Sequence, residues 1–133
     1  MPSRKRSHSE HDIQSDFVQK VRLLTKNKGA PLLFSIPNGI PVFADKATRC
    51  RVGAFFKREG LVAGVPDLYL ARASHDGSFH GLFLETKTAQ GRLSKEQRAV
   101  RRQLEAAGYR VEVYQSTCDG LEIVQEHLGV KIL

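Results

Sequence analysis

Two apolar segments that each carry charged residues constrain the fold of this 133-residue chain more than any other feature. Residues 67–72 and 81–87 have leucines at alternating positions, a pattern typical of β-strands. The sequence between them, Ser-His-Asp-Gly-Ser at 74–78, is rich in turn-forming residues, so the two strands should form a hairpin. Apolar residues also occupy some of the other positions in both strands, as expected of central strands that helices cover on both sides.

The charged residues of these strands are Asp67, Glu85 and Lys87. Burying them is costly unless they pair with each other or with a metal. Residues two apart in a strand share a face, so Glu85 and Lys87 should point the same way, while strand pairing and twist bring Asp67 near Glu85. Two carboxylates with a backbone carbonyl and waters suit a hard cation such as Mg²⁺ or Mn²⁺.

This constellation predicts a metal-dependent nuclease. The metal would polarise a scissile phosphate and lower the pKa of a bound water, and Lys87 would orient that water or neutralise charge growing on phosphorus. The alternative is a structural pair of Glu85 and Lys87 on a partly exposed strand, because a Glu-x-Lys triplet alone carries almost no information. The Gly-Val bend and the Pro-Asp strand start at 64–67 favour a site.

The charge of the chain indicates an anionic partner. Its formal net charge is +7 and its isoelectric point is near 9.7, which favours nucleic acid over a membrane. Residues 1–66 hold 12 Lys and Arg against 5 Asp and Glu, whereas residues 67–133 hold 9 of each. The excess therefore lies upstream of the two strands. Part of it forms a basic tail at 1–8 that either touches DNA phosphates or is simply solvated.

Cysteine usage and hydropathy indicate the compartment. Cys50 and Cys118 form no disulfide framework, which fits a reducing environment. No signal peptide is visible, and no apolar run approaches the roughly 20 residues that a membrane helix needs. We therefore expect a soluble intracellular protein with no membrane partner, in which a single nuclease domain at 9–133 follows the basic tail.

The first predicted helix begins at Ser9, which forms an approximate capping box with Asp12. The residues at 27–31 end it. One apolar stripe of this helix should face the core and consists of Ile13, Phe17, Val21 and Leu24. Glu10 lies on the same stripe, where its carboxylate either favours the positive end of the helix or reaches the metal as a third carboxylate.

The rest of the chain completes an α/β fold. A strand is predicted at 32–36 with a turn at 37–39, a helix at about 45–59, a helix that opens at 93–97 and ends at Gly108, a strand at 109–114, and a helix at about 119–128. The order α-β-α-β-β-α-β-α then gives a mixed central β-sheet flanked by helices.

Two of these helices carry basic residues that are available for DNA contacts. In the helix at 45–59 the apolar residues that should turn inward are Val52, Phe55 and Phe56. The basic residues on its outer side are Lys46, Arg49 and Arg51. In the helix that opens at 93–97, the outer side offers either DNA backbone contacts or a solvated face through Lys95, Arg98, Arg101 and Arg102.

The inner face of the helix that opens at 93–97 contains a polar residue. This face consists of Leu93, Gln97, Val100, Leu104 and Ala107. Gln97 also forms a capping box with Ser94, which would explain it without catalysis. The alternative is that its amide fixes the lysine, a water or the phosphate.

Five motifs occur in order along the chain. They are Glu10 within Ser-Glu-His-Asp-Ile-Gln, Pro-Asn-Gly at 37–39, Gly-Val-Pro-Asp-Leu at 64–68, Glu-Thr-Lys at 85–87 and Leu-Ser-Lys-Glu-Gln at 93–97. In this order, and over about residues 9–129, the chain resembles the virus-type replication-repair nuclease (VRR-NUC) domain of the PD-(D/E)xK superfamily.

The resemblance implies a restriction-endonuclease-like core and a complete set of site residues. The metal ligands would be Glu10, Asp67 and Glu85, assisted by the Thr86 carbonyl. Lys87 would be the catalytic lysine, and Gln97 would be the active-site glutamine. Thr86 stands where an aliphatic residue is more usual, but only its backbone is needed for this role.

The resemblance also implies a setting and a substrate. The chain looks like the standalone form found in phages and mobile elements, which would place it in the host cytoplasm, acting on branched DNA without an organic cofactor. Standalone members are associated with homodimers that resolve four-way (Holliday) junctions, because two-fold pairing supplies two sites for the two cuts. The alternatives are a monomer that nicks flaps or other branched ends, a DNA-binding module without catalysis, and a basic accessory factor.

Overall fold

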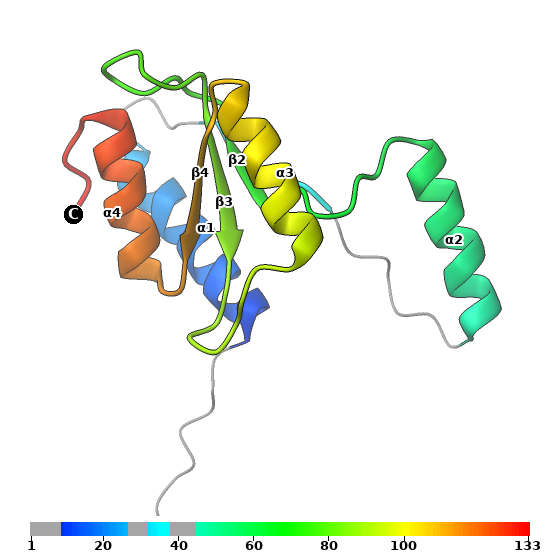
Figure 1. Cartoon of the computed structure of the whole chain (residues 1–133). Helices are drawn as coiled ribbons and strands as arrows, with labels where there is room; N and C mark the ends of the chain where they lie inside the picture. The colour runs from blue at the N-terminus through cyan, green and yellow to red at the C-terminus, as the bar shows by residue number, and fades with distance from the viewer. Residues whose placement is uncertain (1–8, 27–31, 38–44) are drawn as a thin grey trace, which may run out of the picture.

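A four-stranded sheet forms the centre of the computed structural model, which describes residues 9–26, 32–37 and 45–133 (Figure 1). The elements in chain order are α1 (Glu10–Thr25), β1 (Leu33–Ser35), α2 (Lys46–Arg58), β2 (Leu68–Leu70), β3 (Leu82–Thr86), α3 (Lys95–Ala106), β4 (Arg110–Tyr114) and α4 (Thr117–Leu128). Within the described ranges no helix is long and apolar enough to span a membrane.

The sheet order is β1-β2-β3-β4. β2 pairs antiparallel with both β1 and β3, whereas β3 pairs parallel with β4. The predicted order of elements and the mixed sheet are therefore confirmed. The predicted tail at 1–8, the helix end at 27–31 and most of the turn at 37–39 lie outside the described residues.

The main core lies on the face of the sheet that α1 and α4 cover, called here the α1/α4 face. Fully buried leucines from β2 and β3 form its floor, namely Leu68, Leu70, Leu82 and Leu84. Phe17 and Val21 of α1 and Val124 of α4 pack onto them. Because burial of a side chain of this size contributes roughly 1.5–3 kcal/mol, this cluster holds β2 and β3 in one alignment.

The opposite face of the sheet, called here the α3 face, carries the alternate residues of the same strands. Phe34, Tyr69 and Phe83 stack across β1, β2 and β3, with ring centroids 5.7 Å apart for the first pair and 4.5 Å apart for the second. α3 packs beside β4 on this side (Figure 1). Helices therefore lie on both faces of the sheet, as the sequence predicted.

Both central strands are shorter than predicted. β2 begins after Asp67 and β3 ends before Lys87, whereas the sequence predicted strands at 67–72 and 81–87. Of the three charged residues only Glu85 stands within a strand. Regular pairing stops where the apolar alternation gives way to charged side chains that require polar partners.

α1 and α3 begin at the predicted capping boxes, both of which are present. Two inward assignments were wrong. Leu24 is 36% exposed and Thr25 is buried in its place, because the buried stripe through Phe17 and Val21 continues at a spacing of four residues. Ala107 is exposed because α3 has already ended there.

α2 extends away from the rest of the structure (Figure 1). Its N-cap at Asp45 agrees with the predicted start of this helix. The inward assignment of Phe55 and Phe56 was wrong, since these side chains are 50% and 37% exposed; Val52 is half-buried and Gly53 is the buried residue of the helix. In the parts of the chain that the structure describes, no element packs broadly against α2, so its apolar side has little cover.

A buried histidine lies at the end of α4. His127 is 1% exposed, and its Nε2 atom lies 2.7 Å from the carbonyl oxygen of Arg72. Its Nδ1 atom has no hydrogen-bond partner among the described residues. Burial lowers the pKa of His127 below its ordinary value. The folded chain therefore holds the neutral ring, with Nε2–H donating to the carbonyl.

The stability of the chain should fall as the pH drops below about 6.5. The unfolded state takes up the His127 proton first, so this contribution is fully present above the ordinary pKa of histidine. It is lost as the pH falls through the lowered pKa of the folded state. His127→Gln keeps a donor for the carbonyl and does not titrate, so it should flatten the dependence of Tm on pH. His11→Gln, at an exposed position, is the control, and equal flattening in both variants would contradict the assignment.

Candidate active site

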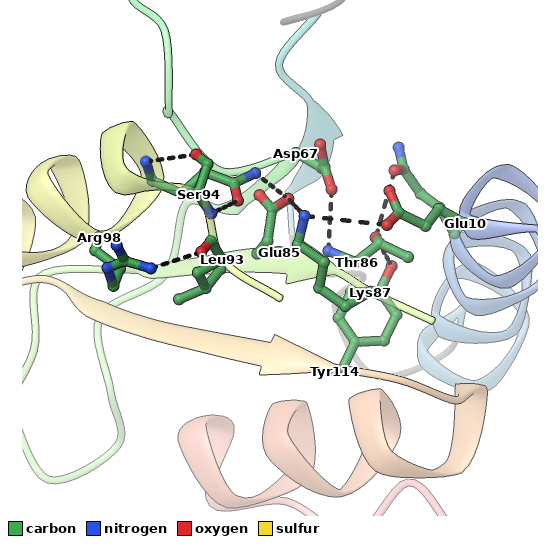
Figure 2. Close-up of polar contacts among 11 residues, drawn as sticks. Glu10, Asp67, Glu85, Thr86, Lys87, Leu93, Ser94, Arg98 and Tyr114 are labelled. Carbon is green, nitrogen blue, oxygen red and sulfur yellow. Dashed lines mark hydrogen bonds and ion pairs between the residues drawn. The ribbon is translucent and has the colours of Figure 1, made fainter. Parts of the chain in front are cut away.

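The register between β2 and β3 brings two acids together. Leu68 pairs with Leu84, so continuing the pairing by one residue sets Asp67 across from Glu85 on the α3 face. The backbone amide of Thr86 donates a hydrogen bond to Asp67 Oδ2 over 3.0 Å (Figure 2). This bond fixes the Asp67 carboxylate at the end of β3, although Asp67 itself lies outside a strand.

Lys87 joins these acids to the first turn of α1. Its Nζ atom lies 3.6 Å from Glu85 Oε1 and 4.0 Å from Glu10 Oε1 (Figure 2). The Lys87 and Glu85 side chains are largely buried, whereas the Glu10 side chain is 46% exposed. Glu85 and Lys87 thus point the same way, as their spacing predicted.

Glu10 approaches the site through the lysine. The capping box of α1 is completed by Asp12, so the helix end already has an acidic partner without Glu10. In the described residues no group of three His, Cys, Asp or Glu side chains is arranged to hold a metal ion as it stands. Whether Glu10 is a metal ligand or serves the helix end therefore stays a prediction.

Gln97 caps α3, as one of the two alternatives predicted, and its amide contacts Glu85, which neither alternative had named. Its Nε2 atom donates to Glu85 Oε1 over 2.8 Å, and its Oε1 atom accepts the backbone N–H of Ser94 over 2.8 Å. The Ser94 hydroxyl oxygen accepts the Gln97 backbone N–H in return. One amide therefore caps α3 and links the start of that helix to the buried carboxylate.

Glu85 has a buried oxygen without a partner. The residue is 4% exposed, and its Oε2 atom makes no hydrogen bond within the described part of the chain. Burial, and then the neighbouring carboxylate of Asp67, raise the pKa of Glu85 to about 7, while Lys87 acts in the opposite direction. An unpaired buried polar atom costs roughly 1–3 kcal/mol, and more when it is charged. The site therefore favours an additional positive group.

The carbonyl of Thr86 points toward the same place. The backbone N–H of Lys87 donates to the carbonyl oxygen of Tyr114 on β4 over 3.0 Å. In a planar trans peptide the C=O points away from the N–H, so the Thr86 carbonyl points away from β4 and toward Asp67. Asp67 thus lies on the side of β3 toward which this carbonyl points, and Glu85 is set across from Asp67.

The sequence missed a polar network on the α1/α4 face. The Thr86 hydroxyl is hydrogen-bonded to the Tyr114 hydroxyl at 2.6 Å and lies 3.4 Å from Gln14 Oε1. Burial raises the pKa of Tyr114 well above its ordinary value, so the ring carries a neutral hydroxyl. The available signal was the threonine in the middle of Glu-Thr-Lys, a polar side chain where an aliphatic one is more usual.

The predicted DNA-contacting residues fall into two groups. Those on α2, which stands apart from the acids, are Lys46, Arg49 and Arg51, all exposed. Those on α3, which begins beside the acids, are Lys95, Arg98 and Arg102, also exposed. Arg98 donates from Nη1 to the carbonyl oxygen of Leu93 over 2.8 Å, whereas Arg101 pairs with Glu105 at 2.7 Å. Their contacts with DNA stay predictions.

The α/β fold and the acid-acid-lysine group at the end of its central strands define a restriction-endonuclease-like nuclease domain. The profile of the VRR-NUC domain matches residues 42–118, more than half of the chain, and the chain belongs to the VRR-NUC family. A solved structure described as a VRR_NUC domain protein is similar, with a TM-score of 0.72 and 25% identity, covering 92% of this chain and 89% of that chain. No curated protein sequence matches.

Membership of this family makes the chain a nuclease that acts on DNA. The matched range includes the predicted DNA-contacting residues of α2 and α3 and five predicted residues of the site itself, which are Asp67, Glu85, Thr86, Lys87 and Gln97. Glu10 lies before the matched range. The roles of the individual residues remain predictions.

Gly64 is required for the contact between this site and α3. Its φ angle is +94°, and a Cβ atom there would lie 2.5 Å from the Glu96 carbonyl group and 2.8 Å from the Gln97 nitrogen. Gly64→Ala should therefore push the start of α3 away and separate Gln97 from Glu85. We expect a loss of about 1–2 kcal/mol from the left-handed backbone alone and a further loss from the displaced helix.

Gly77→Ala is the matched control, because Gly77 also has a positive φ of +76°, but apart from its chain neighbours no described residue has an atom within 4 Å of its Cβ position. Chemical denaturation measures the stability of both variants, and cleavage assays follow the site. The Gly64 variant should lose more stability and should also lose cleavage. Equal stability losses with cleavage retained in both would show that the close contact with α3 is unimportant.

Proposed function

We propose that the chain is a Mg²⁺- or Mn²⁺-dependent, structure-selective DNA endonuclease that works as a homodimer on four-way junctions. The observation that carries the metal dependence is Glu85 Oε2, a buried carboxylate oxygen without a partner among the described residues. The β2–β3 register sets Glu85 across from Asp67, and the Thr86 carbonyl points toward Asp67.

These donors fit a hard divalent cation. Two carboxylates and one carbonyl are the oxygen ligands that Mg²⁺ and Mn²⁺ prefer. Asp67, Glu85 and Thr86 would hold the ion, and Glu10 would contribute a further carboxylate. When bound, the ion would supply positive charge to the phosphate and make a bound water more acidic.

The chain's own residues perform the remaining tasks. The Lys87 amine, held between two glutamates, would orient the attacking water and neutralise charge developing on the phosphate. Gln97 fixes one oxygen of Glu85 and leaves the other free for the ion. The basic residues at the start of α3 would hold the DNA backbone beside these groups.

Replacing Glu85 should abolish cleavage without unfolding the chain. Glu85→Gln keeps the acceptor for Gln97 and replaces a buried charge that faces Asp67 with a neutral amide. Tm should therefore be unchanged or higher, while cleavage should fall at least about 100-fold. Asp67→Ala and Lys87→Ala should also abolish cleavage with DNA binding largely kept. If Glu85 and Lys87 were only a structural pair, Glu85→Gln would lower Tm and retain cleavage.

Metal requirements complete this test. EDTA should stop the reaction, and Mg²⁺ or Mn²⁺ should restore it. Ca²⁺ is larger and more loosely coordinated, so it should support DNA binding without cleavage.

Calorimetry on the free protein separates the two possibilities for Glu10. Glu10→Gln should weaken metal binding if Glu10 is a ligand, and should cost no more than about 1 kcal/mol of stability with cleavage retained if it serves only the helix end.

The dimer is supported by symmetry and by α2. Resolving a junction requires two cuts in strands of like polarity, and a two-fold pair of chains supplies two sites with the symmetry of the junction. α2 projects from the sheet with Phe55 and Phe56 exposed, a clustered pair of rings whose centroids lie 5.8 Å apart. Covering such a pair with a second copy would remove it from water.

Light scattering at micromolar concentration should give twice the 14.9 kDa mass of a single chain. Phe55→Ser combined with Phe56→Ser should yield monomers if α2 forms the interface. Val130→Ser, at an exposed apolar residue near the C-terminal end, is the matched control and should leave the mass unchanged. A wild-type mass near that of one chain would rule out a stable dimer.

A panel of labelled junction, flap and duplex DNAs tests the substrate. Symmetric paired incisions confined to the four-way junction would support resolution. Affinity should fall steeply as salt rises, because basic residues displace counterions from the phosphates. Preferential cutting of flaps would instead favour the monomeric branched-end nuclease, and binding without cutting would favour a non-catalytic module.

A further inference from the structure

A polar cluster lies directly behind the site on the other side of β3. Its members are the side chains of Gln14, Thr86 and Tyr114, from α1, β3 and β4. Thr86 and Tyr114 are fully buried. Thr86 has one hydroxyl proton, so both of its bonds are satisfied when Tyr114 donates to Thr86 and Thr86 donates to Gln14 Oε1.

Tyr114 holds the end of β3 at two points. Its carbonyl oxygen accepts the Lys87 backbone N–H over 3.0 Å, and its ring hydroxyl bonds to the Thr86 hydroxyl at 2.6 Å. The ring cannot shift easily. It packs against Phe17 with centroids 4.6 Å apart, and the backbone of Gly120 approaches both rings so closely that a Cβ there would lie 2.7 Å from one and 3.0 Å from the other.

This polar cluster is not required for packing. Valine at position 86 and phenylalanine at position 114 would fill nearly the same space without burying any polar atom. Buried polar groups are costly unless they are paired, and a paired set adds only about 0.5–1.5 kcal/mol per bond. What the hydroxyl bond adds over dispersion is direction, because hydrogen bonds depend on angle.

The hydrogen bond between the Thr86 and Tyr114 hydroxyls fixes the orientation of the Thr86–Lys87 peptide unit. With the Thr86 side chain held on the α1/α4 face and the Lys87 N–H held by β4, rotation of this unit is restrained at both ends. The Thr86 carbonyl then stays pointed toward Asp67, whose carboxylate is bonded to the Thr86 amide. The Lys87 side chain starts from the same fixed backbone.

We propose that Tyr114 and Gln14 are positioning residues, which act through the Thr86 hydroxyl to hold the Thr86 carbonyl and Lys87 in the geometry that binds a divalent cation. This inference rests on the metal-dependent activity proposed above. It assigns to the α1/α4 face a role in metal affinity that the family resemblance, which needs only the Thr86 backbone, does not require.

The test measures Mn²⁺ affinity of the free protein by calorimetry, together with kcat and KM for cleavage. Tyr114→Phe and Thr86→Val should each weaken Mn²⁺ binding and lower kcat by about 10-fold or more, the range found for outer partners of metal ligands. KM for DNA should change little. The double variant should be no worse than Thr86→Val alone, because that substitution already removes the bond to Tyr114. Thr86→Ser retains the hydroxyl and should retain affinity.

Thr25→Val is the matched control. Thr25 is a buried threonine whose hydroxyl donates to the Val21 carbonyl oxygen over 2.6 Å, away from the site. It should lower Tm without changing Mn²⁺ affinity. If Tyr114→Phe and Thr86→Val behave like Thr25→Val, or if their effects on affinity multiply in the double variant, the positioning role is wrong while the metal-dependent nuclease stands. A wild-type protein that neither binds Mn²⁺ nor cleaves DNA would overturn both.

Discussion

β3 pairs antiparallel with β2 and parallel with β4, and this double pairing determines where the candidate functional side chains lie. The antiparallel register sets Asp67 across from Glu85, and the parallel register sets Thr86 beside Tyr114. Because side chains alternate along a strand, Glu85 faces α3 while Thr86 faces α1 and α4. A shift of β3 by one residue relative to both of its neighbours would exchange these faces, so the acids and the polar cluster would be lost together.

Burial of apolar side chains stabilises the register of the strands, whereas the buried acid of the site destabilises the fold. The strand leucines bury completely on the α1/α4 face, and each contributes roughly 1.5–3 kcal/mol. Glu85 faces the other way, and one of its oxygens has no partner among the described residues, which costs roughly 1–3 kcal/mol or more. The buried leucines and Glu85 are neighbours on β3, so the burial of the leucines offsets the free-energy cost of burying the Glu85 carboxylate on the same strand. The same alternation that fills the core therefore presents the acid.

The sequence predicted those parts of the site that depend on local pattern. Glu85 and Lys87 share a face because they are two residues apart, and the hairpin with the preceding strand brought Asp67 close. Periodicity also shows which residues of a helix share a side, but not whether anything covers that side, which is why the exposed phenylalanines of α2 were predicted to be buried. The contact between Thr86 and Tyr114 joins residues 28 apart through a parallel pairing whose register no local pattern reveals.

The two faces of β3 are chemically different, and a side chain on one face affects the other face through the backbone of the strand. A neutral side chain on the α1/α4 face reaches the charged side only by setting the orientation of a peptide unit. The unit that follows Thr86 is where this happens, since its carbonyl points toward Asp67 while the Thr86 hydroxyl is held on the opposite face. Where an aliphatic residue occupies this position, packing alone must hold the strand end, and dispersion contacts are individually weak and have little dependence on angle. The bond between the Thr86 and Tyr114 hydroxyls therefore mainly orients the peptide unit and adds little to burial. Its loss would leave the core intact and would still disturb the geometry of the site.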